Sequence, residues 1–343
     1  MENNFSRAQQ TKDNLEPGIR RVPAKQIPTP TADVSDKAQT AIGAAYNSMM
    51  DWDLDPGSPQ GWKDAIANTA AQSEPLILGM LQALEVTMEQ REIGGVNCYV
   101  LTPKSIPAAH RNQQVVVAHG GGYVFTPGPA GVGEAAIVAA LGGYRTIAVD
   151  YRMAPDAPFP AAVDDMVAVW RSLAAENDPR CLAMTGTSAG GGLILAALLK
   201  IKAMGLPMPG AIAPSSPWAD LTETGDSYQT NEWIDNVLVS YSGFLGRAAR
   251  LYAAGHDLHD PLLSPINGDF SGFPPALFIA GTRDIFLSNA VRAHRKMRRA
   301  GIDSQLHVFE GISHAQLSFD PSMPETVEAY GEIRTFFDQY LAT

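Results

Sequence analysis

Strand-like and helix-like segments alternate through most of this chain, and their rhythm limits the folds it can adopt. Strand-like apolar runs lie at 113–120, 144–152, 181–186, 210–218, 275–281 and 305–311. Helix-like segments lie between the first four of them, at 133–141, 157–175 and 189–205. Because parallel strands need long crossover connections, the pattern predicts an α/β fold with a mostly parallel central sheet flanked by helices.

The chain divides into two regions by texture. Residues 1–83 are helix-like and rich in turns, and they carry no strand signal. An extended hairpin around Gly94 and Gly95 then opens the region 84–343, which we expect to form the α/β domain. Helix-like residues at about 228–259 interrupt the strand rhythm, so we expect a helical insertion above the sheet.

Composition excludes several classes of protein. The formal net charge of -11 disfavours nucleic acid as a partner, because binding phosphates needs an excess of Lys and Arg. No run approaches the roughly 20 apolar residues that span a bilayer, and no signal peptide is evident. The two cysteines, Cys98 and Cys181, lie in strand-like runs and are expected to be buried free thiols. We therefore expect a cytoplasmic protein without a membrane partner.

The strongest local signal is the sequence Gly-Thr-Ser-Ala-Gly at 186–190, between a strand-like run and a helix-like run. This G-x-S-x-G motif is typical of a sharp strand-to-helix turn that exposes a nucleophilic serine, here Ser188. The alternative is a turn rich in small residues that only joins the two elements.

A second motif, His119-Gly120-Gly121-Gly122-Tyr123, follows the strand-like run 113–120. Glycines let backbone N–H groups approach a developing oxyanion, so this loop is a candidate oxyanion-binding loop. The alternative is a dinucleotide-binding loop. Its glycine spacing fails here, because Phe125 occupies the place of the third glycine.

An activated serine needs a base and a carboxylate that orients the base. Of the seven histidines, His314 has the most suitable place, in a loop just after the last strand-like run. Asp284 follows the strand-like run 275–281, at the end of a strand where open α/β sheets place their sites. Asp269 and Asp303 are the alternative carboxylates, since a sequence gives no distances.

Two further clusters have ordinary explanations. His256-Asp257-Leu258-His259-Asp260 could supply metal ligands, but it lacks the Cys or wider His spacing of a zinc site. The basic run 294–299 is expected to be a solvated helix face in an acidic protein. We therefore predict no metal site.

The motifs in order resemble those of the bacterial hormone-sensitive-lipase family of α/β-hydrolases, from about residue 84 to the C-terminus. They are HGGGYVFTPG, DYRMAPDAPFPAAVDD, GTSAGG, SPWADLT, DPLLSP, GTRD and GISH. Thr187 is typical of the GTSAG branch, whose members are often dimeric, so a homodimer is expected. Asp156 departs from the family, which commonly has Glu there, and this puts the anchoring of its loop in doubt.

The resemblance implies an esterase without metal or organic cofactor, with an oxyanion hole formed by Gly121, Gly122 and Ala189. It also implies that the N-terminal helical region, residues 1–83, is a cap. Apolar cap positions are then expected over the acyl pocket, among them Ile42, Tyr46, Met49, Met50 and Trp52. The alternative is that these residues only pack against the edge of the core. His119 is expected to support the glycine loop.

The predicted function is hydrolysis of a small, short-acyl carboxylic ester through an acyl-enzyme. Ser188 attacks the carbonyl, His314 takes its proton, and Asp284 orients the imidazole. The same triad could carry out acyl transfer, or hydrolyse a lactone, an amide or a thioester. A non-catalytic binding protein on this fold is the alternative from another class.

Overall fold

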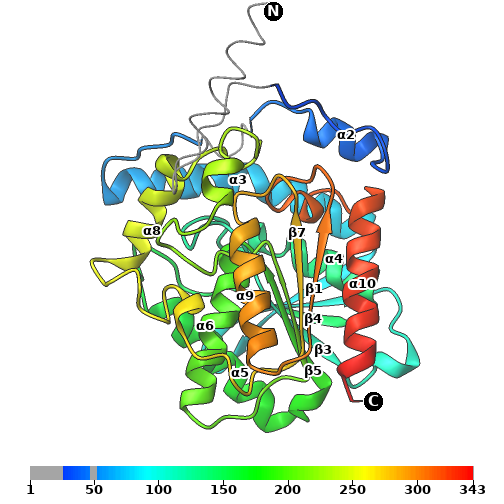
Figure 1. The fold of residues 1–343 in the computed structure, drawn as a ribbon. Helices are drawn as coiled ribbons and strands as arrows, with labels where there is room; N and C mark the ends of the chain where they lie inside the picture. Colours follow the sequence, from blue (N-terminus) through cyan, green and yellow to red (C-terminus); the bar gives the residue numbers. More distant parts are fainter. Residues whose placement is uncertain (1–25, 47–51, 343) are drawn as a thin grey trace, which may run out of the picture.

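An eight-stranded sheet forms the centre of the computed structural model, which describes residues 26–46 and 52–342. The strand order is β1-β2-β4-β3-β5-β6-β7-β8 (Figure 1). The strands are β1 (Val86–Ile93), β2 (Val96–Pro103), β3 (Gln114–Ala118), β4 (Arg145–Val149), β5 (Leu182–Thr187), β6 (Ala211–Ser215), β7 (Ala276–Gly281) and β8 (Ser304–Phe309). β1 and β2 form an antiparallel hairpin, β2 pairs antiparallel with β4, and every other pair is parallel. The predicted α/β fold is confirmed.

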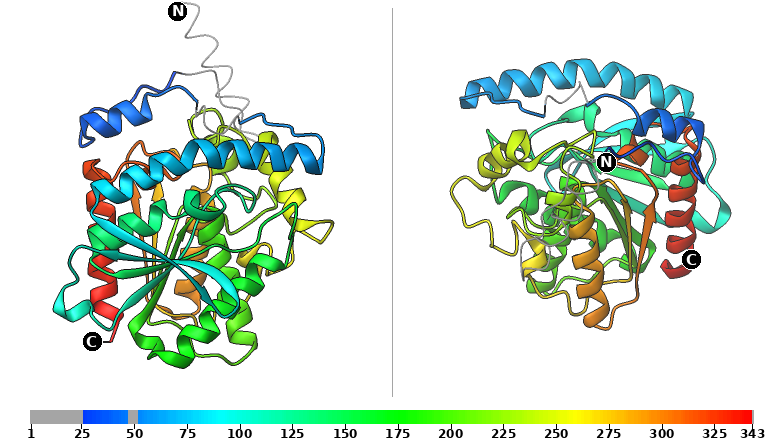
Figure 2. Two further views of the ribbon diagram at one scale, coloured as in Figure 1. Left: turned by 180° about the vertical axis from the view of Figure 1, so that it is seen from behind. Right: turned by 45° about the horizontal axis from the view of Figure 1, so that its top comes forward.

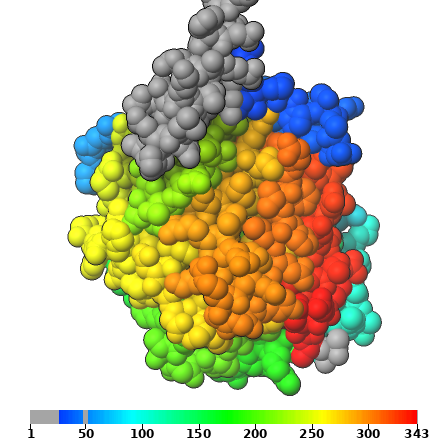
Figure 3. All heavy atoms as spheres, viewed as in Figure 1, coloured from blue at the N-terminus to red at the C-terminus, as the bar shows by residue number. Residues whose placement is uncertain are grey.

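Helices cover both faces of this sheet. They are α2 (Asp36–Ile42), α3 (Pro59–Ala83), α4 (Gly133–Gly142), α5 (Ala161–Glu176), α6 (Ala189–Ala203), α7 (Ser227–Thr230), α8 (Gly246–Ala253), α9 (Leu287–Arg299) and α10 (Pro324–Tyr340). α4 and α10 share one buried apolar cluster, whereas α5, α6 and α9 share another on the opposite face. The C-terminal part of the chain, from about β7 to α10, covers much of the surface seen in Figure 3.

The alternation of side chains along β3 explains why the buried run 115–118 is entirely apolar. Val115 and Val117 belong to the cluster under α4 and α10, and Val116 and Ala118 belong to the cluster under α5 and α6. Successive strand residues point to opposite faces, so a strand buried on both sides has no polar position.

Two segments lie outside this layered core. α3 begins at Ser58, whose hydroxyl accepts a hydrogen bond from the Gly61 N–H at 3.1 Å, and Pro59 follows as the first helical residue. With α2 it lies across the end of the sheet to which the arrows of β7 and β8 point (Figures 1 and 2). Between β6 and β7 the chain forms α7, the short π-helix η4 (Tyr241–Leu245) and α8, and this stretch contains no strand.

One element was misplaced by the sequence pattern. Cys98 lies in β2, but Cys181 ends a short 3-10 turn, η3 (Pro179–Cys181), just before β5. Both thiols are free and buried, and burial raises the pKa of Cys98 to about 12. Within residues 26–46 and 52–342, no helix combines the length and apolarity that crossing a membrane requires.

Candidate active site

Ser188 occupies the junction between β5 and α6 with an unusual backbone conformation. Its φ and ψ angles are 61° and -123°, a region that residues with a side chain rarely adopt. Backbone hydrogen bonds hold it there: the Ser188 N–H donates to the Ser215 carbonyl at 3.0 Å, and its carbonyl accepts from Trp218 at 2.8 Å. The serine is therefore fixed by β6 and by the loop that follows β6.

The glycines of the motif are needed because the backbone of β3 lies against the turn. A Cβ atom on Gly186 would lie 2.5 Å from the Ala118 carbonyl oxygen, and one on Gly190 would lie 1.9 Å from it. Neither position can hold a larger residue without moving β3. The predicted sharp strand-to-helix turn is thus present at Ser188.

The glycine-rich loop after β3 lies against the same turn. Gly121 and Gly122 have φ angles of 109° and 64°, and a Cβ atom on Gly121 would lie 2.5 Å from the Phe125 carbonyl oxygen. Among the described residues, none accepts a hydrogen bond from the N–H of Gly121 or Gly122. Ala189 is the first residue of α6, where backbone N–H groups have no partner within the helix. These three N–H groups are available to a ligand.

His119 anchors the glycine-rich loop. Its ring stacks on Tyr151 at 4.2 Å between centroids, and the Tyr151 hydroxyl donates to the His119 carbonyl at 2.8 Å. Its Nδ1 lies 2.7 Å from the Gly120 carbonyl oxygen and 3.0 Å from the Thr126 hydroxyl. Burial lowers the pKa of His119, which favours the neutral ring. Its contacts are therefore those of a loop anchor.

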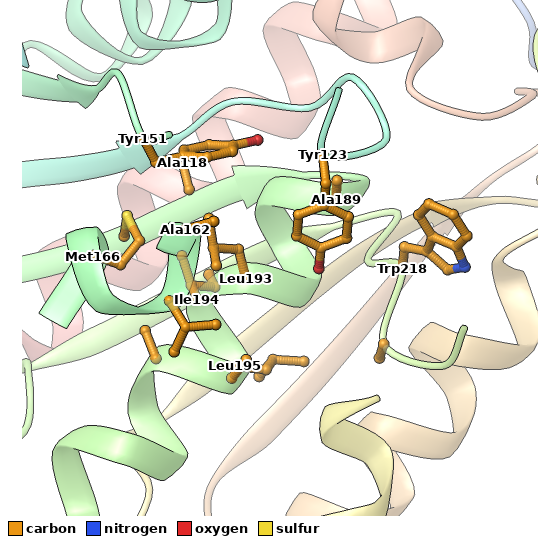
Figure 4. Packing of buried hydrophobic residues seen from close by; sticks show 14 of the residues in the cluster. Ala118, Tyr123, Tyr151, Ala162, Met166, Ala189, Leu193, Ile194, Leu195 and Trp218 are labelled. Carbon is orange, nitrogen blue, oxygen red and sulfur yellow. The ribbon is translucent and has the colours of Figure 1, made fainter. Parts of the chain in front are cut away.

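Tyr123 continues the loop into the core. Its ring stacks on Tyr252 at 3.9 Å between centroids and lies 6.1 Å from the Trp218 ring, which Figure 4 shows to the right of Tyr123. A Cβ atom on Gly192 would lie 2.9 Å from the Tyr123 hydroxyl, so glycine there leaves room for the phenol. The aromatic anchor fixes the backbone on which Gly121 and Gly122 lie.

Asp284 and His314 meet beyond the ends of β7 and β8. The His314 Nδ1 lies 3.0 Å from Asp284 Oδ1, and the same oxygen accepts the Phe286 N–H at 2.7 Å. Both side chains are almost completely buried, and the edge of the Phe286 ring lies against the imidazole. The His314 Nε2 has no hydrogen-bond partner among the described residues. One ring nitrogen is therefore held by a carboxylate, and the other is unused.

The alternative carboxylates lie elsewhere. Asp269 pairs with Lys202 at 2.7 Å on the surface, and Asp303 contacts Tyr340 and Arg298 just before β8 begins. Because they precede β7 and β8, they lie at the opposite edge of the sheet from His314. Of the three carboxylates considered, only Asp284 bonds to the His314 ring.

The two histidines considered as metal ligands, His256 and His259, also make their contacts away from Ser188 and His314. His259 contacts Asp257 at 3.0 Å on the surface, and His256 packs its ring against Phe159. In the part of the chain that the structure describes, no three His, Cys, Asp or Glu side chains are grouped as metal ligands would be. Asp156, which departs from the family pattern, forms an exposed ion pair with Lys63 of α3 at 2.5 Å. An exposed pair of this kind contributes little to stability.

The sequence reasoning missed a buried carboxylate beneath the serine turn. Glu134 of α4 accepts hydrogen bonds from the Thr187 N–H at 3.0 Å and from the Thr187 hydroxyl at 2.8 Å. Burial raises its pKa from 4.5 to about 7, although both bonds from Thr187 oppose the rise. Thr187 in the G-x-S-x-G motif is therefore a donor matched to a carboxyl group 53 positions earlier in the chain.

Glu134 makes the stability of the fold depend on pH. Between about pH 4.5 and 7 the folded chain keeps a proton on Glu134 that the unfolded chain releases, so stability falls as pH rises through this window. Glu134→Gln removes the titration and keeps an acceptor and a donor for Thr187. As pH rises from 5 to 8, we expect the free energy of unfolding of Glu134→Gln to increase relative to that of the wild type, by on the order of 1 to 3 kcal/mol.

Urea unfolding of both proteins at several pH values measures this difference. Glu328→Gln, on the exposed face of α10, is the control and should follow the wild type throughout. Curves for Glu134→Gln and wild type that run parallel from pH 5 to 8 would contradict the account of Glu134.

Comparison with known proteins identifies the family of the chain. A family model described as the alpha/beta hydrolase fold matches residues 115–318. An acetyl-hydrolase of Streptomyces hygroscopicus is 32% identical over 220 residues, which cover 64% of this chain and 73% of the relative.

Solved structures extend the likeness to nearly the whole chain. The crystal structure of esterase E25 superposes with a TM-score of 0.89 at 35% identity, covering 94% of this chain and 99% of that one. An esterase of the bacterial hormone-sensitive lipase family superposes with a TM-score of 0.72 at 32% identity, covering 78% and 91%. The chain therefore belongs to the alpha/beta hydrolases, within the bacterial hormone-sensitive-lipase family of esterases.

Proposed function

We propose that this carboxylesterase hydrolyses small, short-acyl esters with Ser188 as nucleophile, His314 as general base and Asp284 as the carboxylate that orients the base. The observation that carries the proposal is the pair formed by His314 Nδ1 and Asp284 Oδ1 at 3.0 Å, with Nε2 left without a partner. A base for serine needs this arrangement, with one nitrogen oriented and the other available for the hydroxyl proton.

The reaction proceeds in two halves. The Ser188 oxygen attacks the ester carbonyl while His314 Nε2 takes the serine proton, and the imidazolium then gives that proton to the departing alcohol. Water, deprotonated by the same nitrogen, attacks the resulting acyl-serine and releases the acid. The buried Asp284 carboxylate stabilises the imidazolium in both halves.

The backbone N–H groups of Gly121, Gly122 and Ala189 are assigned as the hydrogen-bond donors to the oxyanion of each tetrahedral intermediate. In a serine protease the loss of one oxyanion donor costs about 2.7 to 4 kcal/mol of barrier. The positive φ angles of both glycines and the anchoring of the loop by His119 and Tyr123 support this role.

The acyl group is assigned to an apolar region beside the glycine loop. A Cβ atom on Gly122 would lie 3.7 Å from both Phe244 and Ala248 and 3.9 Å from Trp218. These side chains come from the segment between β6 and β7, so that segment forms one wall of the proposed pocket. Apolar walls and a few aimed N–H groups are typical of small-ligand sites.

Residues 1–83 are proposed as a cap over this pocket. The Trp52 carbonyl accepts the Phe244 N–H at 2.8 Å, and its ring meets Trp233 edge-on at 5.0 Å. Tyr46 also packs on Trp233, at 6.3 Å between centroids. Ile42 instead lies in the core on the α4 side, which favours packing for that residue. Met49 and Met50 lie outside the described residues.

A rate panel tests the proposed substrate class. We expect p-nitrophenyl acetate and butyrate to be hydrolysed with the highest kcat/KM, long-chain esters more slowly, and matched amides, lactones and thioesters slowest. The reason is that a similar protein is an acetyl-hydrolase, and that p-nitrophenol leaves the tetrahedral intermediate more easily than an amine does. A lactone or an amide turned over faster than every ester would contradict the proposal.

The same panel applied to Trp52→Ala tests the cap. We expect the preference for acyl length to shift while the melting temperature changes little, because the substitution removes the ring that contacts Trp233 but keeps the carbonyl that accepts the Phe244 N–H. An unchanged preference accompanied by a large loss of stability would show that Trp52 only packs.

The cytoplasmic location and the homodimer stay predictions. Light scattering on the full chain measures the oligomeric state.

A further inference from the structure

The segment between α7 and η4 contains a carboxylate that the proposed reaction does not use. Asp235 has no exposed surface, although a buried charge is costly unless it is well bonded. Its neighbours are the two loops that carry Asp284 and His314. Hydrogen bonds to both of its side-chain oxygens stabilise the carboxylate at this position.

One oxygen of Asp235 closes a local turn. Asp235 Oδ1 accepts the Val237 N–H at 2.9 Å and the Leu238 N–H at 3.1 Å. Such bonds to residues two and three positions ahead are common for Asp in turns, and a serine hydroxyl can accept similar ones. This oxygen serves the segment itself.

The other oxygen joins the acid loop to the base loop. Asp235 Oδ2 accepts the N–H of Ile285, which directly follows Asp284, at 2.9 Å. It also accepts the backbone N–H of His314 at 3.3 Å. A single oxygen atom is therefore bonded to both strand-end loops whose side chains must meet.

A second side chain of the same segment supports this arrangement. The Asn231 amide donates to the Asp284 carbonyl at 2.8 Å and to the Thr282 carbonyl at 3.1 Å. The Asn231 carbonyl in turn accepts the Asp235 N–H at 2.9 Å. The segment thus holds the acid loop at three backbone positions.

Electrostatics agrees with a close relation to the triad. Burial and the nearby Asp284 carboxylate raise the pKa of Asp235 to about 6, while His314 and the backbone N–H groups oppose the rise. Asp284 and His314 are the titratable groups that act on it. An ionised Asp235 adds a second negative charge beside the imidazole.

We propose that Asp235 is a positioning residue for the hydrolysis, and that its Oδ2 holds the loops of Asp284 and His314 in register. This inference rests on the proposed roles of those two residues. The alternative is that Asp235 matters only for the turn at Val237 and Leu238, in which case the triad does not depend on it.

Two substitutions separate these roles. Asp235→Ser keeps a hydroxyl for the local turn but does not reach Ile285 or His314. Asp235→Asn keeps Oδ1 as the acceptor for the turn. Its amide NH₂ replaces Oδ2, so it can no longer accept hydrogen bonds from the N–H groups of Ile285 and His314. Asp257→Asn is the matched control, since that exposed carboxylate only bonds to His259.

For Asp235→Ser and Asp235→Asn we expect kcat on a short-chain ester to fall on the order of 10- to 100-fold with little change in KM, because misplaced catalytic groups act on the chemical step. The acid limb of the pH–rate profile should move to lower pH, because losing a buried negative charge disfavours the imidazolium. Asp257→Asn should match the wild type in both measurements.

A double-mutant cycle gives the decisive comparison. In an Asp284→Asn background, Asp235→Ser should cost several-fold less in kcat than it does in the wild type, because one of the two loops that Asp235 holds no longer carries a carboxylate to orient the imidazole. Equal losses in both backgrounds, an unshifted acid limb, or unfolding of both Asp235 variants at the assay temperature would overturn the proposal.

Failure of this inference is distinguishable from failure of the proposed function. If the wild type hydrolyses esters and Asp235→Ser does so equally well, only the positioning role is wrong. If the wild type hydrolyses no ester, the downfield NMR resonance of the His314 Nδ1 proton still tests the inference. A resonance that stays unchanged in Asp235→Ser would refute it.

Discussion

Ser188→Ala should lower kcat on a short-chain ester by about six orders of magnitude, as in other enzymes with a serine triad. The variant has no nucleophile, and the oxyanion loop alone provides only a small residual rate. Alanine tolerates the Ser188 backbone conformation about as well as serine does, so the melting temperature should change little. Steady-state rates and thermal unfolding of the same samples check both expectations.

Ser216→Ala is the matched control for that substitution. Ser216 is also a buried serine with a positive φ angle, 41°, and it follows the neighbouring strand β6. It should retain most of the activity. Turnover by Ser188→Ala above the background of the assay, at a rate close to that of Ser216→Ala, would remove Ser188 from the mechanism.

Asp284→Asn should lower kcat by about 10⁴-fold with the fold intact. Asp284 Oδ1 accepts from both Phe286 and His314, and Oδ2 has no partner among the described residues. An amide of the same shape therefore fits, but it brings no negative charge to stabilise the imidazolium. It can also hold the ring in the wrong tautomer by donating to Nδ1.

Asp269→Asn and Asp303→Asn are the controls, because both carboxylates lie near the surface and contact Lys202 and Arg298. Both should retain wild-type rates at every pH. Near-normal turnover by Asp284→Asn would reopen the choice of carboxylate.

Local patterns account for most of what could be predicted. Apolar runs predict the strands β3 and β5, which are buried on both faces. The glycines of the G-x-S-x-G motif predict the turn at Ser188, where the backbone of β3 leaves no room for a larger side chain. The hairpin of β1 and β2 follows from Gly94 and Gly95. In each case the signal is visible in a short stretch of sequence, as an apolar run, a G-x-S-x-G motif or a pair of glycines, even where the contact that requires it is distant.

The missed residues have partners far away in the chain. Glu134 meets Thr187 across 53 positions, and Asp235 meets Ile285 and His314 across 50 and 79 positions. Nothing in the local sequence marks either carboxylate, since Glu134 reads as an ordinary first-turn residue of a helix. Asp284 is favoured by its place just after a strand-like run, but its distance to His314, which separates it from Asp269 and Asp303, comes only from the structure.

The central claim is that Ser188 is the nucleophile, and covalent labelling tests it most directly. A fluorophosphonate probe reacts with a serine whose hydroxyl is activated by a base. We predict that the full-length chain takes up one probe, and that peptide mapping by mass spectrometry locates the adduct on Ser188. An adduct on any other residue, or no adduct under conditions where the ester is hydrolysed, would contradict the account.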